Sequence, residues 1–225
     1  MIRVAVAGAA GRMGSAVCDS VSGADDMEVT GRADPSLGTS LADVLAGADV
    51  LVDFTVPGEV IDNARACLAA GVDLVIGATG FDEQELRRLC AAHPERRVFV
   101  APNFAIGAVL MMRFAAEAAR HMEAAEIIEY HHPAKLDAPS GTARRTARLM
   151  REAAGREVPI HSLRLPGVVA DQDVVLGGQA QTLTIRHVTT DRTSFMPGVL
   201  LAIRRVSTLT ESPTVGLERL LWPSG

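Results

Sequence analysis

Three glycines, Gly8, Gly11 and Gly14, interrupt an apolar run near the start of the chain and limit what it can fold into. The residues before them, IRVAVA, are typical of a buried strand, and those after them, SAVCDSVSGADD, are typical of a helix that ends near Gly23. A strand, a glycine-rich turn and a helix in this order let the backbone approach a pyrophosphate closely and aim a helix N-terminus at it. The pattern therefore predicts a turn that binds a dinucleotide.

An acidic residue supports this interpretation. Such a residue usually follows about 20 residues after the turn, at the end of the second strand, where it binds the ribose hydroxyls. Asp34 ends the strand-like segment 27–34 and occupies that place. Glycines also occur in ordinary strand–helix turns, and Asp34 could instead cap a turn that Pro35 and Ser36 begin. The strand, the helix and the acid together favour nucleotide binding.

Strands and helices alternate through the first 104 residues. The strand-like segments are apolar throughout instead of alternating with polar residues, which indicates a parallel sheet covered on both faces. In such a sheet the ligand crevice lies outside the carboxyl ends of the strands. We therefore expect the residues at three strand ends to line the nicotinamide half of the site. These residues are Phe54–Thr55, Gly77–Thr79 and Ala101–Phe104.

The pattern changes after residue 104. A long helix is predicted over 106–122, a strand over 125–132 and a second helix over 142–155. Strand-like segments then follow up to residue 189, with the alternation of a mixed or antiparallel sheet, and residues 195–209 form a returning helix. The predicted fold class is α/β, a Rossmann-type doubly wound parallel sheet formed by 1–104 and 193–225. Residues 105–192 are expected to form an inserted α+β domain.

The composition excludes several classes of protein. The chain is 48% hydrophobic, with a net charge of -5 and a pI near 5.7, whereas a nucleic-acid-binding face normally produces a basic excess. Cys18, Cys67 and Cys90 are widely spaced and lack a metal-binding pattern, as in reduced cytoplasmic proteins. No apolar run approaches the ~20 residues of a membrane span, and no signal-peptide pattern is present. We expect a cytoplasmic protein without nucleic-acid or membrane partners.

The segment EYHHPAKLDAPSGTA, residues 129–143, contains the only lysine of the chain, Lys135. Lysine is a compact point charge whose pKa responds to burial, whereas arginine supplies every other basic side chain here. His131 and His132 precede it, and Asp137 or Ser140 could cap the helix that follows. A titratable imidazole, an ammonium and a helix N-terminus within a dozen residues suit a small carboxylate that also needs a proton.

Each of these residues alone could equally belong to an ordinary turn or cap. A zinc site is excluded because the segment lacks a third ligand and any HExxH or cysteine pattern.

These motifs resemble the bacterial dihydrodipicolinate reductases, also called 4-hydroxy-tetrahydrodipicolinate reductases, of lysine biosynthesis. The resemblance runs in order from about residue 2 to residue 220, through GAAGRMG, DFTVP, IGATGF, APNFAIG, EYHHPAKLDAPSGTA and DRTSFMPGVLLAIRRV. It implies reduction of an unsaturated cyclic dicarboxylate by NADH or NADPH, followed by protonation of the resulting enamine. It also implies a homotetramer assembled through the sheet of the second domain.

The resemblance also implies roles for individual residues. His131 would be the proton donor and acceptor, and Lys135 the second catalytic donor. His132, Gly141 and Thr142 would bind substrate carboxylates. The cofactor would be held by Gly8, Ala9, Ala10, Gly11, Arg12, Met13, Asp34, Gly77, Ala78, Thr79, Ala101, Pro102, Asn103 and Phe104. No metal is implied.

Two features depart from the family pattern. The family usually has Gly-Thr-Thr-Gly where this chain has residues 77–80 with Ala78, so one hydroxyl is missing beside the nicotinamide. The loop after Gly155 is also shorter than in many relatives. Losing one neutral hydrogen bond costs about 0.5–1.5 kcal/mol, which trims affinity without abolishing activity.

The cofactor preference follows from Asp34, whose carboxylate repels a 2′-phosphate, and from Pro35, which offers no charge. NADH is therefore expected to be at least as good a donor as NADPH, although Arg32 on the same strand face could partly compensate.

Two other functions remain alternatives on the sequence alone. A semialdehyde dehydrogenase would need a cysteine nucleophile in a cleft, whereas all three cysteines fall in predicted helices. A non-catalytic NAD-binding regulator would have no reason to keep an imidazole and an ammonium at one anion site.

Overall fold

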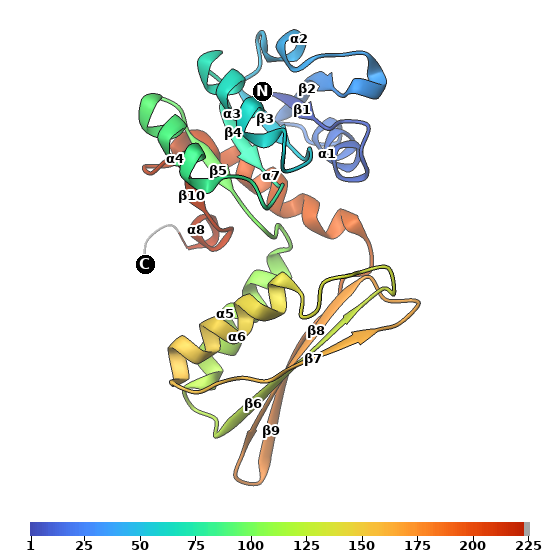
Figure 1. Ribbon diagram of the computed structural model, residues 1–225, viewed down its shortest axis with the longest axis vertical. Coiled ribbons are helices and arrows are strands. Elements are labelled where there is room, and N and C mark those ends of the chain that lie inside the picture. The colour runs from blue at the N-terminus through green and yellow to red at the C-terminus, as the bar shows by residue number, and fades with distance from the viewer. Residues whose placement is uncertain (223–225) are drawn as a thin grey trace. The chain divides into compact units, whose positions relative to one another are not determined.

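The computed structural model describes residues 1–222 and divides the chain into two compact units (Figure 1). The first unit contains Met1–Phe104 and resumes at Phe195, and the second contains Ala105–Ser194. The chain thus returns to the first unit at Phe195, two residues after residue 193, where the sequence predicted the return. Residues 223–225, which the sequence assigns to the first unit, lie outside the described residues.

The first unit is built on a six-stranded parallel sheet. Its order is β10-β5-β4-β3-β1-β2, so the chain starts near one side of the sheet and crosses to the other after β2. Every residue of β3 and β4 is buried, as expected for strands with helices on both faces. The strands are β1 (Ile2–Ala7), β2 (Met27–Ala33), β3 (Val50–Asp53), β4 (Asp73–Ile76), β5 (Val98–Val100) and β10 (Thr214–Val215).

Helices cover both faces of this sheet, which confirms the predicted doubly wound architecture (Figure 1). On one face, α2, α3 and α4 bury their apolar sides against Ala5, Leu51 and Leu74 in a continuous core. On the other face α1 packs beside α7. The helices are α1 (Arg12–Ser22), α2 (Leu41–Leu45), α3 (Val60–Ala69), α4 (Glu83–Ala92), α7 (Met196–Arg205) and α8 (Glu218–Leu221), with 3-10 turns at Pro35–Leu37 and Val206–Thr208.

The second unit is a four-stranded sheet with two helices on one face. The order is β7-β6-β8-β9; β6 pairs parallel with β7 and antiparallel with β8, and β8 pairs antiparallel with β9. The predicted mixed sheet is therefore confirmed. Its elements are α5 (Ile106–Ala119), β6 (Ala124–His131), α6 (Gly141–Ala154), β7 (Ile160–Arg164), β8 (Ala170–Gly178) and β9 (Gln181–His187), and a 3-10 turn spans Arg192–Phe195.

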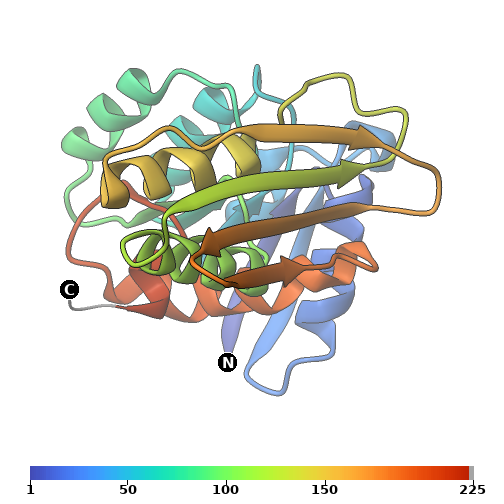
Figure 2. The same cartoon turned by 90° about the horizontal axis from the view of Figure 1, so that it is seen from below.

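The two faces of this second sheet differ. Along β6, Ile127 and Glu129 point to the helix-covered face and are fully buried. Ile128 and Tyr130 point to the opposite face, which Figure 2 shows without a covering helix in this unit. This period of two places Glu129 and His131 on the same face, which matters for the site.

Candidate active site

The glycine-rich turn of the first unit has the geometry of a phosphate cradle. Gly8 has φ +73° and its carbonyl accepts a hydrogen bond from the N–H of Gly11 at 3.0 Å. A Cβ on Gly14 would lie 2.0 Å from the Gly8 oxygen, and a Cβ on Gly8 would lie 2.9 Å from the Phe54 oxygen. Side chains are thus sterically excluded from Gly8 and Gly14. Gly11 is the N-cap of α1 and has no side chain to satisfy the first N–H groups of the helix, which suits an anion.

Asp34 lies immediately beyond β2 and joins two loops. Its carboxylate accepts hydrogen bonds from the N–H and the hydroxyl of Ser36, at 2.9 and 2.7 Å, and from the N–H of Ala10 at 3.2 Å. The hydrogen bonds from Ser36 hold the pKa of Asp34 below its usual range. The turn-capping role considered from the sequence is therefore real. The contact with Ala10 also places this carboxylate beside the glycine turn.

The strand ends of the first unit converge at its carboxyl edge. The Phe54 ring lies so close to Gly77 that an added Cβ there would be 2.1 Å from the ring. The Phe54 and Phe104 ring centroids are 5.8 Å apart. Ala78 is buried beside this edge. Phe54, Gly77 and Phe104, predicted at the ends of β3, β4 and β5, are thus brought together within the first unit.

Sequence reasoning missed the buried carboxylate that fixes one of these strand ends. Asp53 is fully buried and accepts hydrogen bonds from the N–H and the hydroxyl of Thr55, at 2.8 and 2.6 Å, and from Asn63 at 2.9 Å. It therefore ties the loop after β3 to α3. The available signal was an acid at the end of an apolar strand followed two residues later by threonine, the pattern of a side chain that caps its own turn.

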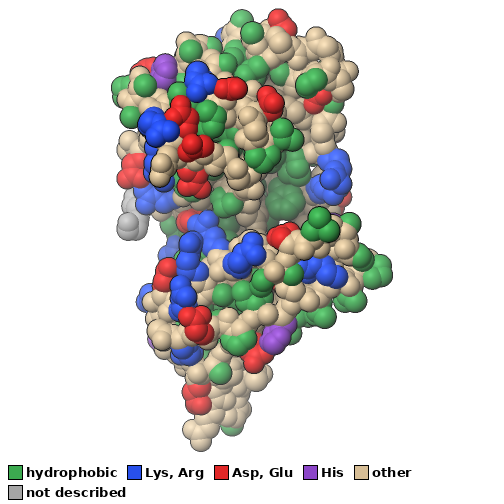
Figure 3. Space-filling view, viewed as in Figure 1, with side chains coloured by type: hydrophobic (Ala, Val, Ile, Leu, Met, Phe, Trp, Pro, Cys, Tyr) green, Lys and Arg blue, Asp and Glu red, His purple; other side chains and the backbone are tan. Residues whose placement is uncertain are grey.

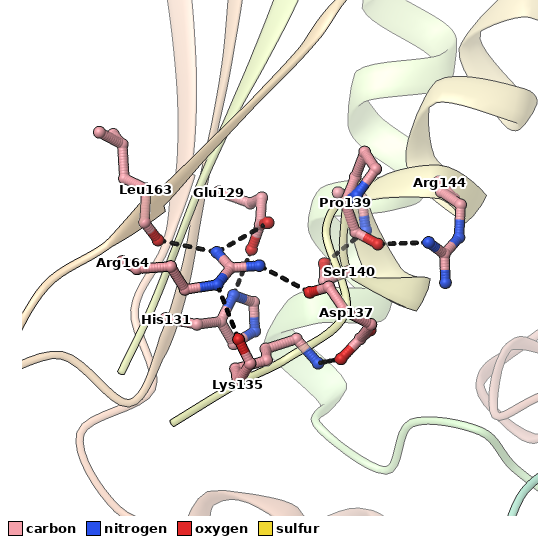
Figure 4. Close-up of polar contacts among 10 residues, drawn as sticks. Glu129, His131, Lys135, Asp137, Pro139, Ser140, Arg144, Leu163 and Arg164 are labelled. Carbon is pink, nitrogen blue, oxygen red and sulfur yellow. Dashed lines mark hydrogen bonds and ion pairs between the residues drawn. The ribbon is translucent and has the colours of Figure 1, made fainter. Parts of the chain in front are cut away.

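His131 ends β6 in the second unit, beside a buried carboxylate (Figure 4). Its Nδ1 contacts Glu129, which is fully buried and also binds Arg164. Burial lowers the pKa of His131, and the Glu129 charge opposes this shift. Burial alone would raise the pKa of Glu129, but hydrogen bonds from Ser162 and Arg164 outweigh it and hold the pKa below its usual value. The imidazole Nδ1 is thus occupied by a carboxylate, while Nε2 belongs to the other side of the ring.

Lys135 lies four residues further on, in the loop between β6 and α6. Its Nζ binds Asp137 Oδ1 at 2.7 Å, and its N–H donates to the carbonyl of His132 at 3.1 Å. The Lys135 side chain is 23% exposed. The hydrogen bond from Lys135 lowers the pKa of Asp137. Of the two predicted helix caps, Asp137 is therefore engaged with Lys135.

Ser140 is the residue that caps α6. Its hydroxyl accepts the N–H of Ala143 at 3.1 Å, and the helix begins at Gly141. Gly141 is exposed and Thr142 half-buried, at the positions predicted to bind carboxylate. Further along the same helix, Thr146 donates to the Thr142 carbonyl and accepts from Gln172 of β8, both at 2.9 Å. The sheet thereby holds the first turn of α6 in place.

Basic side chains gather along the outer side of α6 (Figure 3). Arg144, Arg148 and Arg151 are exposed there, close in sequence to the predicted carboxylate-binding residues. Arg148 and Arg151 are paired with Glu152 and Glu157, at 3.9 and 3.2 Å, so their charges are partly neutralised. The described residues contain no group of three or more His, Cys, Asp or Glu side chains arranged to hold a metal ion. Among them, too, no helix has the length and hydropathy that crossing a membrane requires.

The two units together define a class of protein. A doubly wound parallel sheet with a side-chain-free turn against a helix N-terminus fits a dinucleotide. The second unit supplies a partly buried imidazole, an ammonium and a second helix N-terminus. These features are those of a nicotinamide-dependent oxidoreductase.

Comparison with known proteins narrows the class to one family. Residues 2–104 match the family described as "Dihydrodipicolinate reductase, N-terminus", and residues 107–221 match "Dihydrodipicolinate reductase, C-terminus". The chain therefore belongs to the dihydrodipicolinate reductase family. The family, the fold class and the oxidoreductase activity predicted from the sequence are confirmed.

Individual relatives agree along nearly the whole chain. The 4-hydroxy-tetrahydrodipicolinate reductases of Cutibacterium acnes and Thermobifida fusca are each 48% identical, over 98% of this chain and 99% of their own length. A dihydrodipicolinate reductase from Paenisporosarcina sp. TG-14, solved with dipicolinate bound, is 37% identical with a TM-score of 0.85, covering 97% of this chain and 99% of its own. The alignment with the Cutibacterium acnes protein spans 249 positions against 225 residues here, so that relative has additional residues.

Proposed function

We propose that the chain reduces 4-hydroxy-tetrahydrodipicolinate to tetrahydrodipicolinate in the diaminopimelate and lysine pathway, with His131 and Lys135 as its catalytic residues. The observation that carries this assignment is the arrangement of the second unit, where an imidazole, an ammonium and a helix N-terminus occur between residues 131 and 142. The names of the closely similar curated relatives support the reaction.

The first unit holds the nicotinamide cofactor, which supplies a hydride when bound. Side chains are excluded from Gly8 and Gly14, so the backbone of the turn meets the pyrophosphate, and the strand ends at Gly77–Thr79 and Ala101–Phe104 line the nicotinamide. This cradle is formed by Gly8, Ala9, Ala10, Gly11, Arg12 and Met13. Asp34 binds the ribose hydroxyls and disfavours a 2′-phosphate, so NADH is at least as good a donor as NADPH.

His131 delivers the proton that the reduced ring requires. Glu129 contacts Nδ1, so Nε2 is the nitrogen that faces the substrate. Lys135 provides a second donor on a flexible stem, and its partner Asp137 is 52% exposed, so the ammonium can exchange this partner for a substrate carboxylate. His132, Gly141 and Thr142 bind the carboxylates, because the first N–H groups of α6 favour an anion.

The second unit also assembles the protein into a homotetramer. The uncovered sheet face carries apolar Ile128 and Leu163. Beside them lies a polar cluster in which Tyr130 donates to Asp173 at 3.1 Å and Arg186 lies 3.3 Å from Asp173. A sheet face of mixed character that no helix covers in its own unit suits contact with a second copy.

Oxidation of NADH by the purified protein tests the reaction. The substrate is formed in the cuvette from pyruvate and aspartate semialdehyde by a dihydrodipicolinate-forming enzyme, and loss of reduced cofactor is followed with and without that enzyme. We expect turnover only with it, and none with aspartate semialdehyde alone. Oxidation of the semialdehyde with NAD would instead indicate a dehydrogenase. The buried Cys18, Cys67 and Cys90 in α1, α3 and α4 argue against that, since burial raises the pKa of each thiol.

A further inference from the structure

Glu129 is a fully buried carboxylate in the middle of the second unit, and none of the roles above assigns it a function. One of its oxygens contacts His131 Nδ1, and the other accepts a hydrogen bond from Arg164 Nη1 at 3.0 Å. A buried carboxylate is costly unless it is paired and hydrogen-bonded. Both oxygens of Glu129 are satisfied, so the cost of burying the charge is offset by these contacts.

Arg164 extends the same network to the loop that carries Lys135 (Figure 4). Besides binding Glu129, it donates to the carbonyl of Asp137 from Nη2 at 2.7 Å and to the carbonyl of Lys135 from Nε at 3.3 Å. The Arg164 side chain is only 21% exposed. One rigid guanidinium therefore joins the carboxylate behind the imidazole to the backbone on both sides of Leu136.

We infer that Glu129 and Arg164 are positioning residues for the reduction: Glu129 fixes the tautomer and orientation of His131, and Arg164 fixes the Lys135 loop relative to that imidazole. A carboxylate on Nδ1 keeps the proton on that nitrogen in the neutral ring, which leaves Nε2 to exchange a proton with the substrate. The planar fork of arginine can hold three acceptors in one geometry, whereas a lysine cannot.

This inference rests on the proposed function, because it assigns His131 the proton transfer. A purely structural ion pair would predict something different, namely loss of stability without a change in the chemistry of the imidazole. The discriminating measurements are therefore made on His131 itself. The charged groups that act on its pKa are Glu129 from β6, Arg164 from β7 and Lys135 from the connecting loop.

The test compares Glu129→Gln with the wild-type protein and with Glu117→Gln. Glu117 of α5 is the control because its carboxylate also faces a histidine, 3.7 Å from His121 just beyond the helix, in an exposed pair away from the site and the open sheet face. Nitrogen NMR of the imidazole, assigned with His131→Gln, reports the tautomer and the pKa without substrate. Steady-state kinetics across pH reports kcat and KM separately.

In the wild type we expect the Nδ1–H tautomer. In Glu129→Gln we expect a mixed or inverted tautomer, a lower His131 pKa, and a kcat lower by roughly 10²–10⁴, the usual range for a misdirected general acid or base. The acidic form of His131 is then lost at lower pH, so the limb of kcat that reports it moves to lower pH. Glu117→Gln should match the wild type in all three measurements.

Arg164→Lys keeps the charge but loses the fork. We expect kcat to fall at least about tenfold, equivalent to about 1.4 kcal/mol, with the KM for NADH unchanged. An unchanged tautomer and pH profile in Glu129→Gln, or wild-type kcat in Arg164→Lys, would overturn the inference. If the wild type fails to reduce the substrate while its NMR behaviour changes as expected in Glu129→Gln, the proposed function fails and the coupling of Glu129 to His131 stands.

Discussion

Replacing Lys135 with alanine separates its contribution to stability from its contribution to chemistry. Its Nζ lies 2.7 Å from Asp137, but 23% of the lysine side chain and 52% of the aspartate side chain are exposed. An ion pair this exposed contributes about 0.2–1 kcal/mol. We therefore expect the free energy of unfolding of Lys135→Ala to fall by at most about 1 kcal/mol, which lowers Tm by roughly 2–4 °C in a domain of this size.

The effect on turnover should be far larger. A positioned proton donor contributes typically about 10²–10⁴-fold to rate, so kcat should fall by roughly that factor. The KM for the substrate should rise, while the affinity for NADH should stay nearly unchanged because the cofactor residues belong to the other unit. Lys135→Arg should also be poor, because the planar guanidinium does not reproduce a compact donor on a flexible stem.

Steady-state oxidation of NADH with substrate formed in situ measures both variants, and thermal unfolding measures their stability. Arg148→Ala is the control, because Arg148 forms a more exposed ion pair with Glu152 at 3.9 Å in the same unit. It should leave kcat unchanged. Near-normal turnover of Lys135→Arg would show that charge alone suffices, and a loss of Tm well beyond about 4 °C in Lys135→Ala would show that the residue is structural.

Four other substitutions test the site and the pH dependence of stability. His131→Gln should lower kcat strongly with little loss of stability, whereas His132→Gln should mainly raise the KM of the substrate; exchanged phenotypes would reverse these two assignments. Asp34→Ala should move the ratio of kcat/KM values toward NADPH, and a wild-type enzyme that strongly prefers NADPH would refute the role given to its carboxylate. Burial lowers the pKa of His187 in the folded state, and the charge of Asp171 opposes this shift. In the unfolded chain the same histidine has its ordinary pKa of about 6.5, so below that pH the unfolded chain binds more protons than the folded one. The contribution of His187 to the free energy of unfolding should therefore be fully present above about pH 6.5 and decline as the pH falls below it. Denaturant unfolding of His187→Gln at several pH values should show a shallower decline. If the decline of the unfolding free energy with pH were unchanged in this variant, His187 would not be its cause.

The sheet of the first unit could be predicted because its signals are local. Buried parallel strands appear as short apolar runs, and β3 and β4 are buried at every residue. The glycine turn was equally visible, since Gly8 adopts φ +73° and Gly14 packs directly against the Gly8 carbonyl, both within the turn itself. The helix predicted over 106–122 ends earlier, at Ala119. Helix ends depend on local backbone hydrogen bonds, which apolar periodicity does not reveal.

The support behind the imidazole could not be predicted in the same way. Glu129 and Arg164 are 35 residues apart, and no pattern in either segment predicts that β6 and β7 pair in parallel. The contact follows from one register, in which His131 pairs with Arg164 and Glu129 with Ser162. A shift by one residue would turn Arg164 to the uncovered face of the sheet. In the sequence Glu129 resembles any other polar residue of a strand, although the period of two already places it on the same face as His131.

The division of labour between Arg164 and Lys135 explains why the chain keeps a single lysine. Arg164 holds one carboxylate and the loop carbonyls of Lys135 and Asp137 with a fork that is fixed by its own geometry, which is what a support needs. Lys135 rests on a loop that this fork holds, and its partner Asp137 is half exposed, so the ammonium can move to a ligand without leaving a buried charge unpaired. Exchanging the two residue types would fail in both directions. A lysine at 164 could not span the three acceptors, and an arginine at 135 would bring a planar group with fixed donor directions to a place that needs a donor able to turn.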